Sequence, residues 1–173
     1  MGRTSIALLV GGLALVSAAC SDSPTTVTGQ TTVLSVVPAP NAANVDQAQP
    51  VVIGFSHAMR MGMEQYAALH EGDVTGPVVP GTWNWSSDRT QLTFIPVAAL
   101  KPETHYAIHL GGGMRDAAGN MLDYQYCASQ LGGQWVTQSM MGGSMMGGGT
   151  NMMGTGWQGA DGTYGMIFFF TTA

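Results

Sequence analysis

Three Met-Met pairs set among glycines are the most distinctive chemical feature of this sequence, in the stretch SMMGGSMMGGGTNMMGTG of residues 139–156. Thioethers are soft, neutral donors that favour Cu(I) or Ag(I) over hard cations, and flexible glycines would let several sulfurs converge on one ion. A cysteine upstream would strengthen such a site as a thiolate. The hypothetical ligands are Met140, Met141, Met145, Met146, Met152, Met153 and Cys127.

Three other interpretations of this stretch stay open. Methionine fills gaps in cores and forms adaptable hydrophobic surfaces, and Met-Gly repeats can be plain low-complexity sequence. Methionine also reduces oxidants and becomes its sulfoxide, so a sacrificial role is the third. Zinc and calcium do not suit the set, because thioether sulfurs are soft, neutral donors.

A second soft cluster occurs in SHAMRMGMEQY, residues 56–66, where a histidine and methionines alternate. If this segment is extended, alternate side chains share one face. The weaker metal candidates here are His57, Met61 and Met63. Two further histidines, His105 and His109, are four residues apart in a strand-like segment. At the usual rise they are about 13 Å apart and too far to chelate one ion together.

The N-terminus has the features of a secretory signal peptide: Arg3, an apolar run over residues 6–16, and small residues up to Cys20. The segment VSAAC resembles the lipobox of bacterial lipoproteins. That resemblance implies cleavage after residue 19, lipid attachment at Cys20 and a membrane anchor made of acyl chains. By resemblance to known lipoprotein sorting, Ser21 also implies outer-membrane delivery where two membranes exist, with the protein facing the periplasm or the surface. A plain signal-peptidase site is the alternative.

The remaining composition limits the function classes. Removal of residues 1–19 from the 173-residue chain leaves 154 residues, enough for one domain. The net charge of −5 becomes −6 without Arg3, so no basic patch for nucleic acid is expected. We find no nucleophile elbow, zinc-protease motif or phosphate-binding loop, and therefore expect a non-enzymatic protein that requires no cofactor.

The strand signals predict an all-β fold. Residues 20–30 are Ser/Thr-rich and suggest a flexible tether, and β-branched or aromatic runs bounded by turn residues follow from residue 31. Short strands with frequent turns favour a single antiparallel sandwich over residues 31–173. Residues 63–72 would form a helical turn or a short strand. The expected core residues are Val36, Ile53, Phe55, Trp83, Leu92, Phe94, Tyr106, Ile108 and Phe169.

The motif order resembles a bacterial Ig-like domain of the SbsA type, found in S-layer and envelope proteins. The resemblance covers residues 33–122 and resumes at residue 168. It is carried by Pro38, Val45, Phe55, Ser56, Met59, Phe94, Pro96, Leu100, Thr104, Tyr106, Asp116, Gly119, Asn120 and Thr171. It implies a structural, adhesive or recognition module without catalytic residues, and it assigns Met59 to packing. Asp116 and Asn120 fit a tight turn; calcium binding with Asp123 is the alternative.

One departure from the family pattern is an insertion at about residues 125–163, a long Met/Gly-rich loop before the last strand. Long loops inside compact domains are commonly functional, and this one lies where Ig-like folds place recognition. We expect the sandwich to fold without residues 130–159. The leading hypothesis is a lipid-anchored, non-enzymatic envelope module with a structural, adhesive or binding role, whose partner would be an envelope protein or a surface polymer. The alternative is a Cu(I)- or Ag(I)-binding envelope protein.

Overall fold

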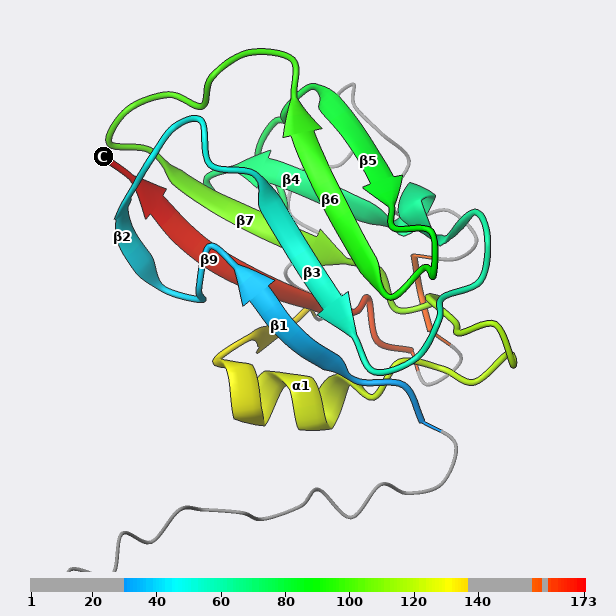
Figure 1. Cartoon of the computed structure of the whole chain (residues 1–173). Coiled ribbons are helices and arrows are strands. Elements are labelled where there is room, and N and C mark those ends of the chain that lie inside the picture. The colour runs from blue at the N-terminus through cyan, green and yellow to red at the C-terminus, as the bar shows by residue number, and fades with distance from the viewer. Residues whose placement is uncertain (1–29, 137–156, 160–161) are drawn as a thin grey trace, which may run out of the picture.

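Two β-sheets packed face to face make up the domain (Figure 1). A computed structural model describes residues 30–136, 157–159 and 162–173, with the backbone but not the side chains of residues 125, 127–129 and 135. The proposed leader, Cys20, all of the tether except residue 30, and all six paired methionines lie outside the described residues. Within the described residues, no helix is long and apolar enough to cross a membrane.

The first sheet is antiparallel throughout. Its strands follow the order β1-β3-β6-β5, where β1 is Val33–Val37, β3 is Val51–Phe55, β6 is Gln91–Pro96 and β5 is Gly81–Trp85. In β6 the buried Leu92 and Phe94 alternate with more exposed residues, because successive strand residues point to opposite faces.

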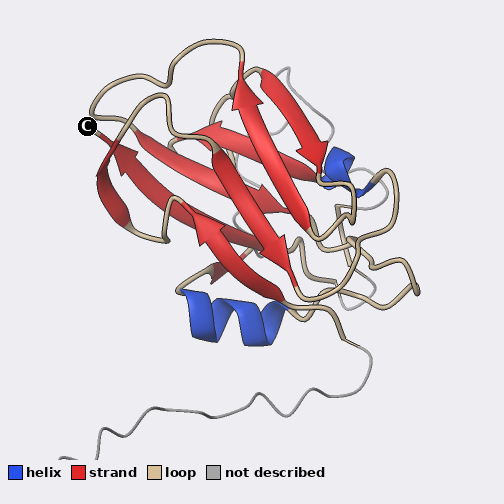
Figure 2. Cartoon of the chain, viewed as in Figure 1, coloured by secondary structure: helices blue, strands red, loops and turns tan. Residues whose placement is uncertain are grey.

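The second sheet is mixed. Its order is β2-β9-β7-β4, where β2 is Ala42–Val45, β9 is Met166–Thr172, β7 is His105–Leu110 and β4 is Ala67–Glu71. The short β8, Gln134–Trp135, also pairs with β9. The β2–β9 pair is parallel, so the expectation of a purely antiparallel sandwich was wrong in this detail. The all-β Ig-like sandwich itself is confirmed, and strands dominate the fold (Figure 2).

The inner faces of both sheets form the main core. Seven of the nine expected core residues are buried there, namely Val36, Ile53, Phe55, Leu92, Phe94, Tyr106 and Ile108. Trp83 is partly buried and packs against Phe94 with ring centroids 4.8 Å apart.

The expected core position of Phe169 was wrong. Phe169 lies opposite Ala107 in the β7–β9 register, between Phe168 and Phe170, which are buried in the main core. Because alternate residues of β9 face opposite sides, Phe169 is on the outer face, where it is partly buried and stacks on His105 with centroids 4.8 Å apart.

Residues 63–71 adopt both conformations that the sequence suggested. A single 3-10 turn, Met63–Tyr66 (η1), leads directly into β4. Gly62 precedes the turn at φ +85°, a backbone conformation that glycine adopts without steric cost.

The insertion begins with regular structure that the sequence analysis took for a loop. The helix α1, Tyr124–Leu131, starts one residue before the expected insertion and lies beside β1 (Figure 1). Its N-terminus is capped by the Asp123 carboxylate, which accepts the N–H of Tyr126 at 3.0 Å. The Tyr124 hydroxyl donates to the carbonyl of Gly111 at 2.6 Å and ties the helix to the sandwich.

A second apolar cluster covers the outer face of the second sheet. It joins the buried Ala68, Val74 and Ile167 to Val136 and Tyr164, with Val78, Trp157 and Phe169 packed against it. Val136 and Trp157 belong to the insertion, so these two described residues of it pack against the sheet and are part of the fold.

Candidate functional site

Among the residues that the structure describes, the predicted metal ligands are not brought together. Cys20 and the six methionines lie outside the described residues, and Cys127 is on α1, where only its backbone is described. No group of three His, Cys, Asp or Glu side chains within the described part of the chain is arranged to hold a metal ion.

The second soft cluster does not share one face. Met61 is 76% exposed, whereas Met59 and Met63 are buried in the main core. The segment turns at Gly62 instead of staying extended, which separates the side chains. His57 is exposed and its Nδ1 lies 2.9 Å from the Ser56 hydroxyl. The Sδ atom of Met63 accepts the backbone N–H of Arg115 at 3.3 Å.

The Asp116–Asn120 segment is a turn closed by its own side chains. Asp116 is buried, and its carboxylate accepts the Thr31 hydroxyl at 2.8 Å and both the backbone and side-chain N–H groups of Asn120, at 2.8 and 2.9 Å. Burial acts to raise the pKa of Asp116, but these hydrogen bonds outweigh it and the pKa lies below its usual value. The network ties the start of the domain, at Thr31, to this turn.

Two buried histidines lie side by side on the outer face of the second sheet, and sequence reasoning missed the pair. His109 of β7 pairs with Ala68 of β4, and His70 of β4 pairs with Ala107 of β7, so the two rings are diagonal neighbours on one face. Their ring centroids are 5.9 Å apart. His70 is 1% exposed and His109 is 0% exposed. The alternation of HYAIHL marked His109 as facing away from the main core, but no sequence signal indicated that β4 lies beside it.

Each of these rings uses one nitrogen and leaves the other without a partner. His70 Nδ1 lies 3.0 Å from the carbonyl oxygen of Gly76, and His109 Nε2 lies 2.8 Å from that of Tyr164. Among the residues that the structure describes, the buried His70 Nε2 and His109 Nδ1 have no hydrogen-bond partner. Burial lowers the pKa of both rings, that of His109 to about 4, so both are neutral at pH 7.

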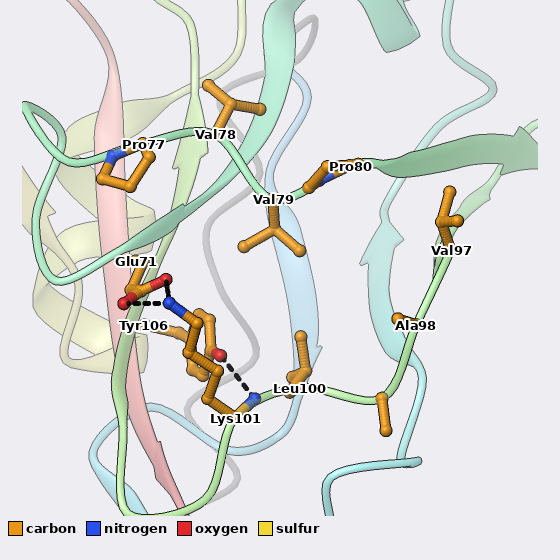
Figure 3. A pocket seen from close by; sticks show the side chains of 11 residues that line it. Glu71, Pro77, Val78, Val79, Pro80, Val97, Ala98, Leu100, Lys101 and Tyr106 are labelled. Carbon is orange, nitrogen blue, oxygen red and sulfur yellow. Dashed lines mark hydrogen bonds and ion pairs between the residues drawn. The ribbon is translucent and has the colours of Figure 1, made fainter.

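An apolar pocket of about 400 Å³ opens at the edge of the sandwich (Figure 3). One wall is the segment of residues 77–80 between β4 and β5, and the other is the segment of residues 97–101 after β6. Apart from Lys101, the side chains shown on these walls are aliphatic chains or proline rings, and Val97 is 81% exposed. A pocket of this size and polarity suits a small apolar ligand or an inserted hydrophobic side chain.

One ion pair and one phenol supply the polar groups of this pocket. Lys101 Nζ lies 2.8 and 2.7 Å from the two carboxylate oxygens of Glu71, and the backbone N–H of Lys101 donates to the Tyr106 hydroxyl at 2.9 Å (Figure 3). Hydrogen bonding and charge from Glu71 raise the pKa of Lys101. These groups can orient a ligand at the rim, and they fix the wall through the buried Tyr106.

Comparison with solved structures finds likenesses over about half of the chain. L,D-transpeptidase 1 of Mycobacterium tuberculosis is 23% identical with a TM-score of 0.37, over 48% of this chain and 36% of that one. The S-layer protein SbsC is 13% identical with a TM-score of 0.40, over 54% and 12%. CopC of Methylosinus trichosporium OB3b is 14% identical with a TM-score of 0.42, over 54% and 85%.

Comparison with protein sequences gives a clear family result. No curated protein sequence is similar enough to be matched. The bacterial Ig-like domain family, however, matches residues 27–129, which is more than half of the chain and includes β1 to β7 and most of α1. Together with the two-sheet architecture, this match shows that the chain belongs to the family of bacterial Ig-like domains.

Proposed function

We propose that this protein is a lipid-anchored module of the bacterial cell envelope that acts by binding a partner, without catalysis. The pocket between residues 77–80 and 97–101 is the observation that carries the proposal. Family membership and the lipobox-like VSAAC support the envelope location, and the motif order supports the SbsA type. A module that is held to a membrane through Cys20 needs only an exposed recognition surface to serve as a structural or adhesive element.

The pocket favours an envelope protein as partner over a surface polymer. Its walls are aliphatic and its polar groups are confined to the Lys101–Glu71 pair and Tyr106. A hydrated polymer would lose hydrogen bonds to water on entering such walls, whereas an apolar side chain gains free energy from the same burial.

Photo-crosslinking in the producing cell tests this proposal. A benzophenone amino acid in place of Val97, at the pocket, should give a discrete crosslinked product, whereas one in place of Ile95 should not. Ile95 is 57% exposed on the neighbouring strand and does not line the pocket. A98W, which fills the pocket, should abolish the Val97 product, while A117W, at an exposed alanine outside it, should not. Equal products from Val97 and Ile95, or a product that survives A98W, would contradict the proposal.

The lipid anchor has its own test. Mass spectrometry of the mature protein should find an acylated cysteine, Cys20, as the first residue, and C20A should release the protein from the outer-membrane fraction. An unmodified terminus at any other residue would refute lipidation and leave the plain signal-peptidase site.

A second candidate function is Cu(I) or Ag(I) binding by the Met-rich segment. One observation favours it: Val136 and Trp157, which flank residues 137–156, both belong to the second apolar cluster, and Trp157 packs on the buried His109. One described end of the Met-rich segment therefore lies beside a histidine with an unpartnered nitrogen.

A Cu(I) titration against a competing chelator tests this candidate. The variant replaces Met140, Met141, Met145, Met146, Met152 and Met153 with leucine, which keeps bulk and apolarity but removes every sulfur lone pair. The wild type should bind Cu(I) more tightly than the variant and should not bind Zn(II). Equal Cu(I) affinity in the two proteins would assign the segment to surface contact.

A further inference from the structure

The unpartnered nitrogens of His70 and His109 call for an explanation, because a buried polar atom without a hydrogen bond is destabilising. Native proteins rarely leave such atoms unpaired. Here two of them occur on adjacent rings, one of which packs against Trp157.

The hydrogen bonds of the two rings determine which tautomers they adopt. A carbonyl oxygen only accepts, so His70 Nδ1 must carry a proton that it donates to Gly76, and His109 Nε2 must carry one that it donates to Tyr164. In a neutral imidazole the other nitrogen then bears a lone pair. Both buried, unpartnered atoms, His70 Nε2 and His109 Nδ1, are therefore free electron-pair donors.

This arrangement matches the way proteins prepare histidines as metal ligands. A ligating histidine commonly donates its second ring N–H to a backbone carbonyl or carboxylate, which fixes the tautomer and the ring orientation. Gly76 and Tyr164 provide such carbonyls, one for each ring. Burial keeps both rings neutral, as ligation requires.

The separation of the rings also fits a shared ion. Two imidazole nitrogens bound to one ion lie about 2 Å from it, which places the ring centres about 6 Å apart when the ion is between them. The observed separation of the centroids is 5.9 Å. His105, on the same face of β7, is exposed and its ring is hydrogen-bonded to the Thr171 hydroxyl, so it does not join the pair.

We propose that His70 Nε2 and His109 Nδ1 form a binding site for a single Cu(I) or Ag(I) ion. Two neutral nitrogens are enough for these ions, which can bind two ligands in a linear arrangement. Zn(II) takes four ligands and Ca(II) six or more. No third His, Cys, Asp or Glu joins them within the part of the chain that the structure describes. Trp157, with its ring centroid 4.9 Å from that of His109, covers the site.

This inference deepens the second candidate function by adding nitrogen ligands, but it does not depend on the thioethers. Only residues of β4 and β7 supply the ligands. The two ideas can therefore fail separately, and the six-leucine variant distinguishes them.

The test is a titration of the mature, ¹⁵N-labelled six-leucine variant with Ag(I), followed by NMR of the histidine ring nitrogens. We expect one equivalent to shift His70 Nε2 and His109 Nδ1 and to leave the nitrogens of the exposed His57 and His105 unchanged. Unchanged signals of His70 and His109 in the folded variant would overturn the proposal, and so would shifts at the exposed histidines alone.

Substitution of the ligands provides a second readout. H70Q and H109Q, each made in the six-leucine variant, should weaken Ag(I) binding by more than about 100-fold. Loss of a residue that only supports a metal ligand weakens binding by up to about 100-fold, and loss of a ligand itself should cost more. H105Q on the same strand should leave binding unchanged and serves as the matched control. Ag(I) binding that survives in a folded H109Q variant would overturn the proposed ligand set. If H109Q does not fold, the NMR titration still tests the proposal, because it needs no histidine substitution.

Discussion

Mild acid should destabilise the metal-free protein through the buried histidines. Burial lowers the pKa of His109 from 6.5 to about 4. Between these two values the unfolded chain binds a proton that the folded chain does not, so the free energy of unfolding must fall as the pH falls. The stabilising preference for the neutral ring is fully present above pH 6.5 and is lost progressively down to about pH 4.

The size of the effect follows from the two pKa values. Lowering the pH from 7 to 5 should reduce the free energy of unfolding by about 1.8 kcal/mol through His109 alone. His70 acts in the same direction, because burial lowers its pKa as well. The charged neighbour of His70 is Asp73, whose pKa is lowered from 3.8 by hydrogen bonds from Thr75, so this carboxylate stays ionised across the window.

Urea denaturation at pH 7, 6 and 5, followed by tryptophan fluorescence in the presence of a chelator, measures this dependence. In H109Q the change in the free energy of unfolding between pH 7 and pH 5 should be smaller by about 1.8 kcal/mol. In H105Q, at an exposed position on the same strand, that change should be the same as in the wild type. A free energy of unfolding that is flat or rises between pH 7 and pH 5 would refute the argument from buried neutral rings.

Three further substitutions, two of them with a matched control, test the packing of the domain. G165A should strongly destabilise the protein, because Gly165 has φ +92° and a Cβ there would lie 1.8 Å from the Leu110 carbonyl oxygen. The matched G162A, at φ +83° but in open space, should lower the free energy of unfolding by only about 1 kcal/mol. D116A should cost about 2 kcal/mol, because it leaves the buried donors of the Asp116 turn unpaired. F168A should cost about 3–5 kcal/mol, and F169A clearly less, because Phe168 is in the main core and Phe169 is partly buried on the outer face.

Thermal and urea unfolding of each pair under one set of conditions provides the measurements. Equal losses for the two glycine variants would contradict the steric argument at Gly165. A larger loss for F169A than for F168A would contradict the assigned register of β9, and an unchanged stability of D116A would show that the turn network is not needed.

The local patterns of the sequence were sufficient for the fold class. Alternation in HYAIHL placed Tyr106 and Ile108 on the core face and His105 and His109 on the other, and the structure agrees. The motif order led to the Ig-like family because those residues make turns and strand ends whose requirements are local. Alternation did not determine which phenylalanine of FFF faces the core, since a run of three apolar residues carries no period.

The helix α1 was missed for a similar local reason. YQYCASQL has only two full turns and a mixed composition, so its periodicity is weak. It is stabilised by the Asp123 cap and by the Tyr124–Gly111 hydrogen bond, and the second of these links positions 13 residues apart. The sequence alone did not indicate that contact.

The sequence by itself determined the strands, the signal-peptide and lipobox features, and the unusual set of thioethers, because these are properties of neighbouring residues. Only the tertiary structure decided that His70 lies beside His109, because that depends on the pairing of β4 with β7 and on its register. A shift of one residue in that register would have turned His70 to the opposite face of the sheet. The contact of Trp157 with His109 likewise joins positions far apart in the sequence, and no local pattern indicated it.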